Sequence, residues 1–311
     1  MKQIYILVVL AIALSSTITA QTPSDGFFMT KGDICIAAGY QHEQWKEYWE
    51  GTLLRDNPNL GTVSTRSIQA MAAYGLTKRI NLIAMLPPYI RTRATAGTLA
   101  GHSGLQDAAL WLKFKPVDRT VGKGLLHVFL AAGGSIPASN YYPDFLPLSI
   151  GLAAKTASFK GNIHYFLPIG LFVGVQGGYH FRSNIHLERD FYYAEGVPYY
   201  TDKVAMPNAA EGSVTVGYYR GALRTEVSWA AMNTLGGGDI RRNEMPFPSY
   251  NMDMQRISWM AQYRFPFLPG FGVTANAAYT LNGRNVGQST MLGGGVLYQF
   301  PVGKKGDQKT N

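Results

Sequence analysis

The chain has 311 residues, of which 15% are charged and 13% aromatic, and its formal net charge is +9. A charged fraction this far below the roughly 25% of ordinary soluble domains argues against a fully solvated globular protein. Because Cys35 is the single cysteine, an internal disulfide is excluded.

The first twenty residues predict a secretory signal peptide. Lys2 supplies a positive charge, an uncharged apolar run extends from Ile4 to Leu14, and small or polar residues lead to Ala20. The apolar run is shorter than the roughly 20 residues that a membrane-spanning helix needs. We therefore expect residues 1–20 to be removed on export. Export makes a nucleic-acid partner a poor explanation of the positive charge, which we instead expect to steer solutes or to line their path.

A period of two recurs along the rest of the chain. In LFVGVQGGYHFR, from Leu171 to Arg182, alternate positions are apolar or glycine, and the positions between them are small or polar after Phe172. This alternation predicts strands with two different faces. Each predicted strand is close in length to a tilted strand that crosses a bilayer, which has about 9–11 residues. The twelve spans are 33–42, 63–75, 80–92, 104–116, 124–134, 148–159, 170–182, 210–219, 222–233, 252–264, 271–282 and 289–300.

Two parts of this pattern stay open. The alternation is weak in the second, third and fifth spans. The stretch 159–170 permits either a turn at 160–162 or a longer sixth strand that turns at 167–170. The pattern also leaves open whether residues 21–31 enter the lumen of a barrel.

Long and short connections alternate between the predicted strands. The stretches 44–61, 94–103, 135–147, 183–209 and 234–250 are long, whereas 77–79, 118–123, 220–221 and 266–270 are short. A barrel with short periplasmic turns and long outer loops has this asymmetry, and a secreted β-sandwich has no reason for it. The sequence therefore predicts an all-β fold, a closed antiparallel transmembrane β-barrel of about 12 strands. We expect a signal peptide at 1–20, a periplasmic N-terminal segment at 21–32, the barrel at 33–300 and a polar C-terminal tail at 301–311.

Aromatic residues near the strand ends are typical of the girdles of outer-membrane barrels. The apolar face is therefore expected to meet lipid and the polar face the lumen. An arginine that faces lipid at mid-membrane costs about 2–4 kcal/mol, so Arg224 and Arg256 should point inward. The residues of the girdles are Tyr40, Tyr74, Tyr179, Phe181, Tyr218, Trp229, Tyr263, Phe265, Tyr279, Tyr298 and Phe300.

This assignment of the two strand faces places a mainly basic set of side chains inside the barrel. A cationic lumen attracts anions, which makes an anion-selective pore one hypothesis. The alternative, which we favour, is that charges neutralise one another in a narrow interior, for example Arg224 or Arg256 with Glu226. The residues expected to line the pore are Asp107, Lys113, Lys155, Gln176, His180, Arg182, Arg224, Glu226, Arg256, Gln262 and Asn276.

Three aromatic residues lie in the first long connection. Trp45, Tyr48 and Trp49 could form an apolar capture site for a solute at the outer mouth. The alternative is that they belong to the aromatic belt or pack the loops over the barrel, and we favour it because such belts are common at this depth.

One stretch resembles a known family of outer-membrane barrels. Between Tyr74 and Pro116 the chain carries Tyr74-Gly75-Leu76, a short polar turn, Pro87-Pro88-Tyr89 and Gly104-Leu105-Gln106-Asp107. This pattern resembles the "MetA-pathway of phenol degradation" family, and YWEGT (48–52) and LNGRNVGQS (281–289) resemble features of its Bacteroidetes-type members. The resemblance implies a channel akin to transporters of hydrophobic and aromatic substrates.

No pattern in the sequence indicates catalysis or a bound cofactor. The six histidines form no H-x-H pair, and the glycine-rich stretches lack a phosphate-binding context. We expect no enzyme, no metal and no cofactor, although a membrane-embedded enzyme is the third alternative.

The expected function is passive uptake of small molecules, with hydrophobic, aromatic or anionic solutes as candidates, through the outer membrane of a Gram-negative bacterium. The expected partners are outer-membrane lipid, a small-molecule solute and, during biogenesis, the barrel-assembly machinery. A structural or adhesive barrel that acts through its extracellular loops is the second alternative.

Overall fold

The computed structural model describes residues 21–98, 100–241, 244 and 251–302, so the predicted signal peptide and most of the predicted tail lie outside the described residues. The described chain is all-β and forms a closed antiparallel barrel of twelve strands, which confirms the predicted fold. No helix of the described part is long and apolar enough to span a membrane.

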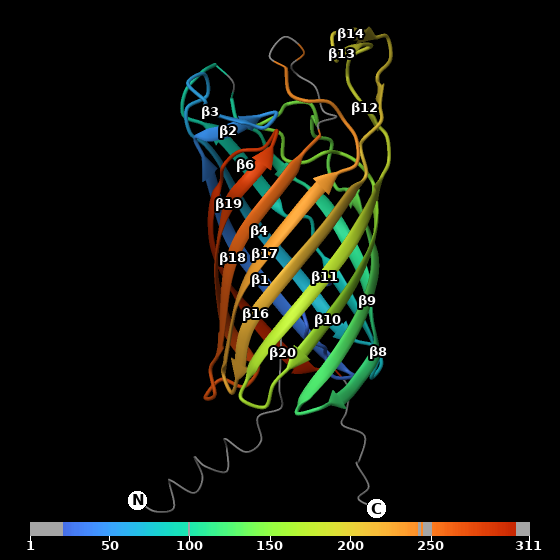
Figure 1. The fold of residues 1–311 in the computed structure, drawn as a ribbon, viewed down its shortest axis with the longest axis vertical. Coiled ribbons are helices and arrows are strands. Elements are labelled where there is room, and N and C mark those ends of the chain that lie inside the picture. The colour runs from blue at the N-terminus through green and yellow to red at the C-terminus, as the bar shows by residue number, and fades with distance from the viewer. Residues whose placement is uncertain (1–20, 99, 242–243, 245–250, 303–311) are drawn as a thin grey trace, which may run out of the picture.

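The barrel strands follow one another in an up-and-down order and tilt around the barrel axis (Figure 1). Closure occurs at β1 (Asp33–Trp45), which pairs with β4 (Val63–Gly75) along one edge and with β20 (Thr290–Pro301) along the other. The other uninterrupted strands are β9 (Gly124–Pro137), β10 (Thr156–Phe166), β11 (Leu171–Arg182), β16 (Ala209–Arg220), β17 (Leu223–Thr234), β18 (Asp253–Arg264) and β19 (Phe271–Arg284).

Two neighbouring strands of the barrel are interrupted. Pro87 and Pro88 divide the third strand, because proline has no N–H group to donate to the ladder. The buried, inward-facing position then shifts from odd residues such as Ile83 to even residues such as Ile90. This shift explains the weak alternation of the predicted span 80–92. The third strand consists of β5 (Ile80–Met85) and β6 (Tyr89–Ala94), and the fourth of β7 (Ser103–Leu105) and β8 (Asp107–Val121).

The sixth barrel strand differs from the predicted span 148–159. It begins at Thr156 and ends at Phe166, and the chain then turns over residues 167–170, which is the second of the two interpretations of this stretch. The apolar alternation before Thr156 comes from the connection that precedes β10. Its buried residues are Leu148, Ile150 and Ala154. The predicted strand was therefore wrong before Thr156, where apolar alternation belongs to a packed loop.

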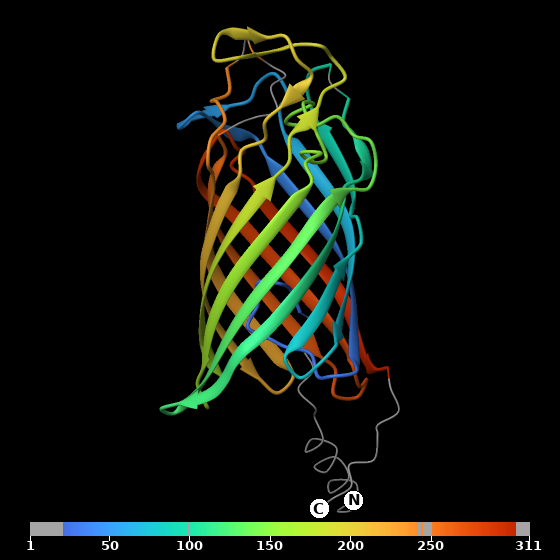
Figure 2. The same ribbon diagram turned by 90° about the vertical axis from the view of Figure 1, so that its right-hand side faces the viewer.

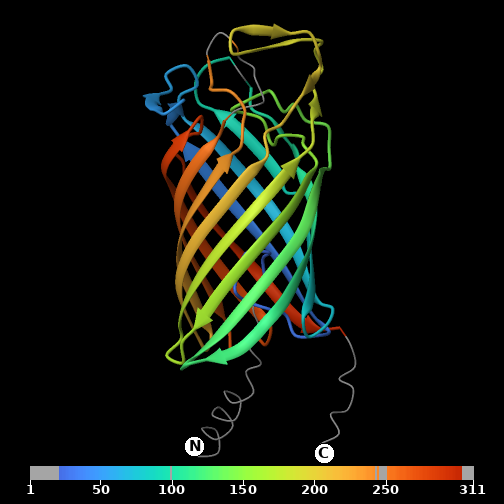
Figure 3. The ribbon, with the colours of Figure 1, turned by 45° about the vertical axis from the view of Figure 1, so that its right-hand side comes forward.

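The connections are short at one end of the barrel, the turn end, and long at the other, the loop end (Figures 1 and 2). The turn end holds the connections 76–79, 122–123, 167–170, 221–222 and 265–270. The described chain also ends there, since the Val302 N–H donates to the Gly32 carbonyl at 2.7 Å. The loop end also holds small strands, and two of them, β13 (Tyr192–Ala194) and β14 (Val197–Tyr199), form a hairpin that rises above the barrel (Figure 3). The other small strands are β2 (Glu47–Glu50), β3 (Leu53–Asp56), β12 (Ile185–His186) and β15 (Lys203–Val204).

The two faces of the wall differ as the alternation predicts. On β11, Val173 and Val175 are 43% and 53% exposed on the outside, whereas Phe172 is 2% exposed on the inside. Large apolar residues are exposed in the same way on other strands, for example Ile68 and Leu292. An apolar band of this extent is stable against hydrocarbon and unfavourable against water.

The segment before β1 lies inside the barrel, in the half next to the turn end (Figure 2). We call residues 21–31 the plug. Gln21, Phe27 and Met29 are 1%, 6% and 2% exposed, although the plug contains no strand. The interior of the barrel is therefore partly filled by the chain's own N-terminal segment.

Candidate functional site: a plugged pore

Lys113 of β8 anchors the plug to the wall. Its side chain is fully buried, and its ammonium group donates to the carbonyl oxygens of Thr22 (3.0 Å), Asp25 (2.7 Å) and Phe27 (3.0 Å). It also lies 2.8 Å from the Asp25 carboxylate. A buried ammonium is stable only when acceptors and a counter-charge replace its water. The plug supplies all of these contacts from a stretch of six residues, 22–27.

A second strand holds the plug by polar contacts. On β10, the Asn162 side-chain amide donates to the Pro23 carbonyl at 3.1 Å, and the Lys160 ammonium donates to the Ser24 hydroxyl at 3.2 Å. These donors are wall side chains, so the plug adds no strand to the barrel. Single side chains of the wall hold the plug, and no ladder of backbone hydrogen bonds joins it to a strand.

Phe27 gives the plug its apolar anchor. Its ring packs edge-on against Phe166, Phe172 and Tyr219, with ring centroids 5.6, 5.8 and 5.1 Å apart. The Arg224 guanidinium lies over the same ring, 3.9 Å from its centroid. Aromatic pairs and a cation over a ring each stabilise such a cluster by about 0.5–1.5 kcal/mol.

Gly26 lets the plug approach the wall at His164. A Cβ atom at residue 26 would lie 2.5 Å from the His164 ring, and a Cβ atom at Gly174, on the neighbouring strand, would lie 2.3 Å from it. The ring therefore sits between two glycines and cannot swing aside. Both of its nitrogens are buried without a hydrogen-bond partner among the described residues.

Charges at the plug are paired within a small cluster. The Arg224 guanidinium donates to the Glu226 carboxylate at 3.0 and 3.1 Å and lies 3.9 Å from the Asp25 carboxylate. Burial alone would raise the pKa of Asp25, but the Lys113 and Arg224 cations hold the pKa below its ordinary value. Asp25 is therefore the ionised counter-charge of the cluster.

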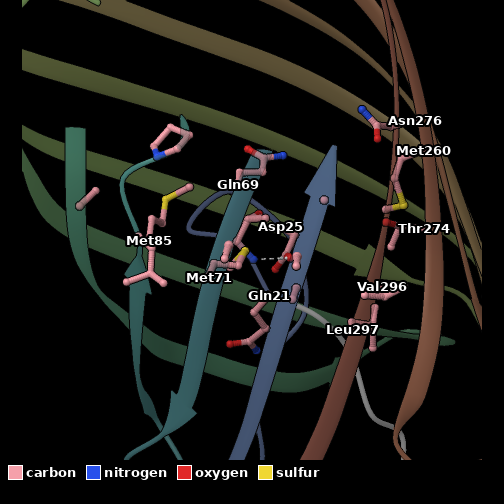
Figure 4. Close-up of a pocket in the computed structure, with 18 of the residues that line it drawn as sticks. Gln21, Asp25, Gln69, Met71, Met85, Met260, Thr274, Asn276, Val296 and Leu297 are labelled. Carbon is pink, nitrogen blue, oxygen red and sulfur yellow. Dashed lines mark hydrogen bonds between the residues drawn. The ribbon is translucent and has the colours of Figure 1, made fainter. Parts of the chain in front are cut away.

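A cavity of about 600 Å³ lies next to the plug inside the barrel. The plug contributes Gln21, Thr22 and Asp25 to its lining. Apolar side chains form much of the wall, with polar groups between them (Figure 4). Met71, Met85, Leu86 and Pro88 line it from β4 and the interrupted third strand, and Met260, Thr274 and Asn276 line it from β18 and β19.

Many interior cations outside this cluster also have carboxylate partners. Arg256 pairs with Glu43 of β1, and Lys160 pairs with Glu211 at 2.6 Å. His180 lies 3.2 Å from the same Glu211 carboxylate. Part of the mainly basic interior inferred from the sequence is thus neutralised, by carboxylates that include several outside the predicted set.

The residues predicted to line the pore occupy four places. Those at the cavity are Asp107, Arg224, Glu226, Gln262 and Asn276. Those on the inward side of their strands, nearer the loop end, are Gln176, His180, Arg182 and Arg256. Lys113 lies against the plug. Lys155 is exposed in the connection before β10, because that strand begins only at Thr156, so its predicted place on a strand was wrong.

Sequence reasoning left open whether residues 21–31 enter the lumen, and it missed the methionines of the cavity. One signal was present, since Phe27, Phe28 and Met29 form an apolar run in a segment that would otherwise lie in water. Met71 and Met85 face each other on paired strands, but the period of two cannot show which inward residues share a cavity.

The outer aromatics pack against another loop. Trp49 is 5% exposed, its backbone N–H donates to the Val286 carbonyl at 2.8 Å, and Tyr48 forms a β-bridge with Gly287. A Cβ atom at Gly287 would lie 2.5 Å from the Trp45 ring. The β2–β3 hairpin is thereby fastened to the β19–β20 connection. Capture of a solute by these residues stays a prediction.

Among the residues that the structure describes, no cluster of three or more histidine, cysteine, aspartate or glutamate side chains is placed to hold a metal ion.

Comparison with protein-family models finds no match, and no curated protein is similar in sequence. The structure is similar to the COG4313 outer membrane channel from Pseudomonas putida F1, with a TM-score of 0.70 and 14% identity over 90% of this chain and 100% of that chain. More distant is the translocator domain of the autotransporter NalP from Neisseria meningitidis, with a TM-score of 0.44 and 12% identity over 96% of this chain and 95% of that chain. The CymD monoaromatic hydrocarbon channel has a TM-score of 0.41 and 10% identity over 88% of this chain and 89% of that chain. The resemblance to the phenol-degradation family has no matching family model and stays a prediction, and the fold is that of outer-membrane barrels.

Proposed function

We propose that the protein is an outer-membrane channel of a Gram-negative bacterium for passive uptake of small, uncharged, mainly apolar or aromatic molecules. The cavity of about 600 Å³ inside the barrel is the observation that carries this proposal. Its volume lies within the range of small-molecule sites, about 300–1,000 Å³. The fold shared with the COG4313 channel and the resemblance to the phenol-degradation family agree with this function.

The lining of the cavity supports an apolar solute. Met71, Met85 and Met260 offer flexible thioethers that make favourable contacts with aromatic rings. Asn276 and Thr274 add polar groups that suit one hydroxyl or carbonyl of a solute. The combination fits a ring with a single polar substituent.

The alternatives receive less support. Anion selectivity needs unpaired cations along the pore, yet Arg224, Arg256 and Lys160 each have a carboxylate partner. A structural or adhesive barrel needs no cavity, and a cavity in the lumen favours transport. Outer-membrane lipid and the barrel-assembly machinery remain the partners that we propose for such a barrel.

The test is solute uptake by porin-deficient cells that express the chain. We expect uptake of phenol to rise several-fold, with smaller increases for benzoate and glucose. Ala109→Trp, which fills the cavity, should abolish the increase, whereas Ala132→Trp, on the outer face of the neighbouring strand β9, should not. Equal increases for all three solutes would contradict the apolar preference, and no increase for any would contradict a channel.

A further inference from the structure

The plug occupies the route between the cavity and the turn end. Gln21, Thr22 and Asp25 form part of the cavity lining. Beyond them, the Phe27 ring fills the space between Phe172 of β11 and Tyr219 of β16. A solute that leaves the cavity toward the turn end therefore meets the plug.

The plug can leave without disturbing the barrel. Its hydrogen bonds to β8 and β10 come from the side chains of Lys113, Lys160 and Asn162, and it contributes no pair to the strand ladders. It joins β1 at Gly32, whose φ of 83° lies in the region that glycine adopts without strain. Release of the plug would thus change one segment of the chain and leave the wall closed.

The free energy of docking is a balance of opposing contributions. Burial of Phe27 and Met29 favours docking. The pair of Asp25 and Lys113 contributes little net stability, because burying both charges costs about as much as their attraction returns. His164 and the Asn162 side-chain oxygen have no hydrogen-bond partner among the described residues, which raises the free energy of the docked state.

From these contacts we propose that the plug is the gate of the channel, and that the Asp25 carboxylate on Lys113 is its latch. In the docked state the plug seals the turn end below the cavity. In the open state Asp25 leaves Lys113, the plug withdraws, and water enters to solvate Lys113, Arg224 and Glu226. This inference rests on the proposed channel function and assigns its regulation to the plug.

A reversible tether tests whether the plug moves. A Cβ atom at Gly26 would lie 3.1 Å from the Cβ of His164, slightly closer than the about 3.5–4.5 Å of a disulfide. Gly26→Cys with His164→Cys, in a Cys35→Ala background, should therefore form a disulfide on oxidation. The double substitution also removes the ring that a side chain at residue 26 would strike.

Single-channel conductance of the full-length mature protein in planar bilayers is the measurement. We expect the open probability of the oxidised double-cysteine protein to be at most about a tenth of that of the reduced protein, and we expect reduction to restore it. The matched control is His164→Cys alone in the same Cys35→Ala background, for which oxidation should change nothing. Heat-modifiable gel migration checks that each variant folds.

Loss of the latch charge tests the same gate from the opposite side. Asp25→Asn keeps the shape of the side chain but leaves the Lys113 ammonium without its counter-charge, so we expect at least about a tenfold rise in open probability. Asp202→Asn, which removes an exposed loop carboxylate paired with His186, should leave it unchanged.

The possible outcomes distinguish an error in the proposed gate from an error in the proposed solute. If the tethered protein conducts as freely as the reduced one, or if Asp25→Asn behaves as the unmodified chain, the plug is not the gate. In that case the exit lies elsewhere, for instance at the interrupted wall beside Pro88. If Asp25→Asn conducts ions freely but takes up no phenol, the gate stands and the proposed solute is wrong.

Discussion

At the scale of single residues, the interior is built from a few close contacts between the plug and the wall. Gly26 lies against His164, and Lys113 is surrounded by plug acceptors at 2.7–3.0 Å. Such contacts tolerate little change in volume or charge, because neighbours that are already close-packed cannot relax.

Gly26→Ala is expected to push the plug out of its docked position. The added methyl group would lie 2.5 Å from the His164 ring, which Gly174 blocks on its other side. Overpacking of this kind costs about 1–3 kcal/mol. That cost should raise the undocked population roughly 5–150-fold.

Limited proteolysis of the N-terminal segment measures this population. Adding His164→Ala to Gly26→Ala removes the obstructing ring and should restore protection. Equal protection of Gly26→Ala and the unmodified chain would contradict the close contact.

At the scale of elements, each barrel strand separates two environments with a period of two. β11 shows this most simply, since Val175 faces outward and its neighbour Gln176 faces inward beside Glu211. The same logic failed before β10, where Leu148 and Ile150 alternate within a packed connection. Alternation therefore identifies a two-faced segment and leaves open what lies on each face.

Val175→Arg is expected to destabilise the folded barrel by about 2–4 kcal/mol, because the guanidinium would face hydrocarbon near the middle of the strand. Gln176→Arg is the matched control, since its charge would point inward toward Glu211 and should cost less. Urea-induced unfolding in lipid vesicles gives both free energies. Equal costs for the two variants would show that the faces are assigned wrongly.

The β2–β3 hairpin is predicted to depend on Trp49 for its packing. Loss of a buried tryptophan costs about 3–5 kcal/mol, so Trp49→Ala should detach the hairpin from the β19–β20 connection. Hydrogen exchange over residues 46–62 should rise, while uptake of phenol stays unchanged. Leu53→Ala, at a position 58% exposed on the same hairpin, is the control and should have little effect. Reduced uptake with intact packing would instead favour the capture role.

At the scale of the whole molecule, closure and the outer apolar band determine where the protein is stable. β1 joins β20 and β4 along twelve paired residues on each side, so the described barrel has no free edge. The band outside, which includes Ile68 and Leu292 at 60% exposure each, needs an apolar neighbour.

The folded protein is therefore expected to require detergent or lipid. Dilution below the critical micelle concentration should precipitate the chain, and transfer into vesicles should preserve its heat-modifiable migration and strand content by circular dichroism. A monomer that stays folded in plain buffer would contradict the lipid-facing assignment of residues such as Val175.

The sequence alone determined the class of fold, because hydrocarbon outside and polar groups inside impose a period of two on every spanning strand. It also determined that Arg224 and Arg256 point inward, since their charges exclude them from the lipid side. Only the tertiary structure decided which charges pair. Arg224 meets Glu226 two residues away, but Arg256 meets Glu43, which is remote in sequence.

The position of the plug was likewise evident only from the tertiary structure. Residues 21–31 have no periodicity, and their place depends on Lys113, Asn162 and His164, which closure of the barrel brings around one point of the lumen. The cavity arises for the same reason, since Met71 and Met260 become neighbours of one space only after the sheet curls. Periodicity along a strand reports the direction of a side chain, whereas contacts across a lumen depend on the register and closure of the whole sheet.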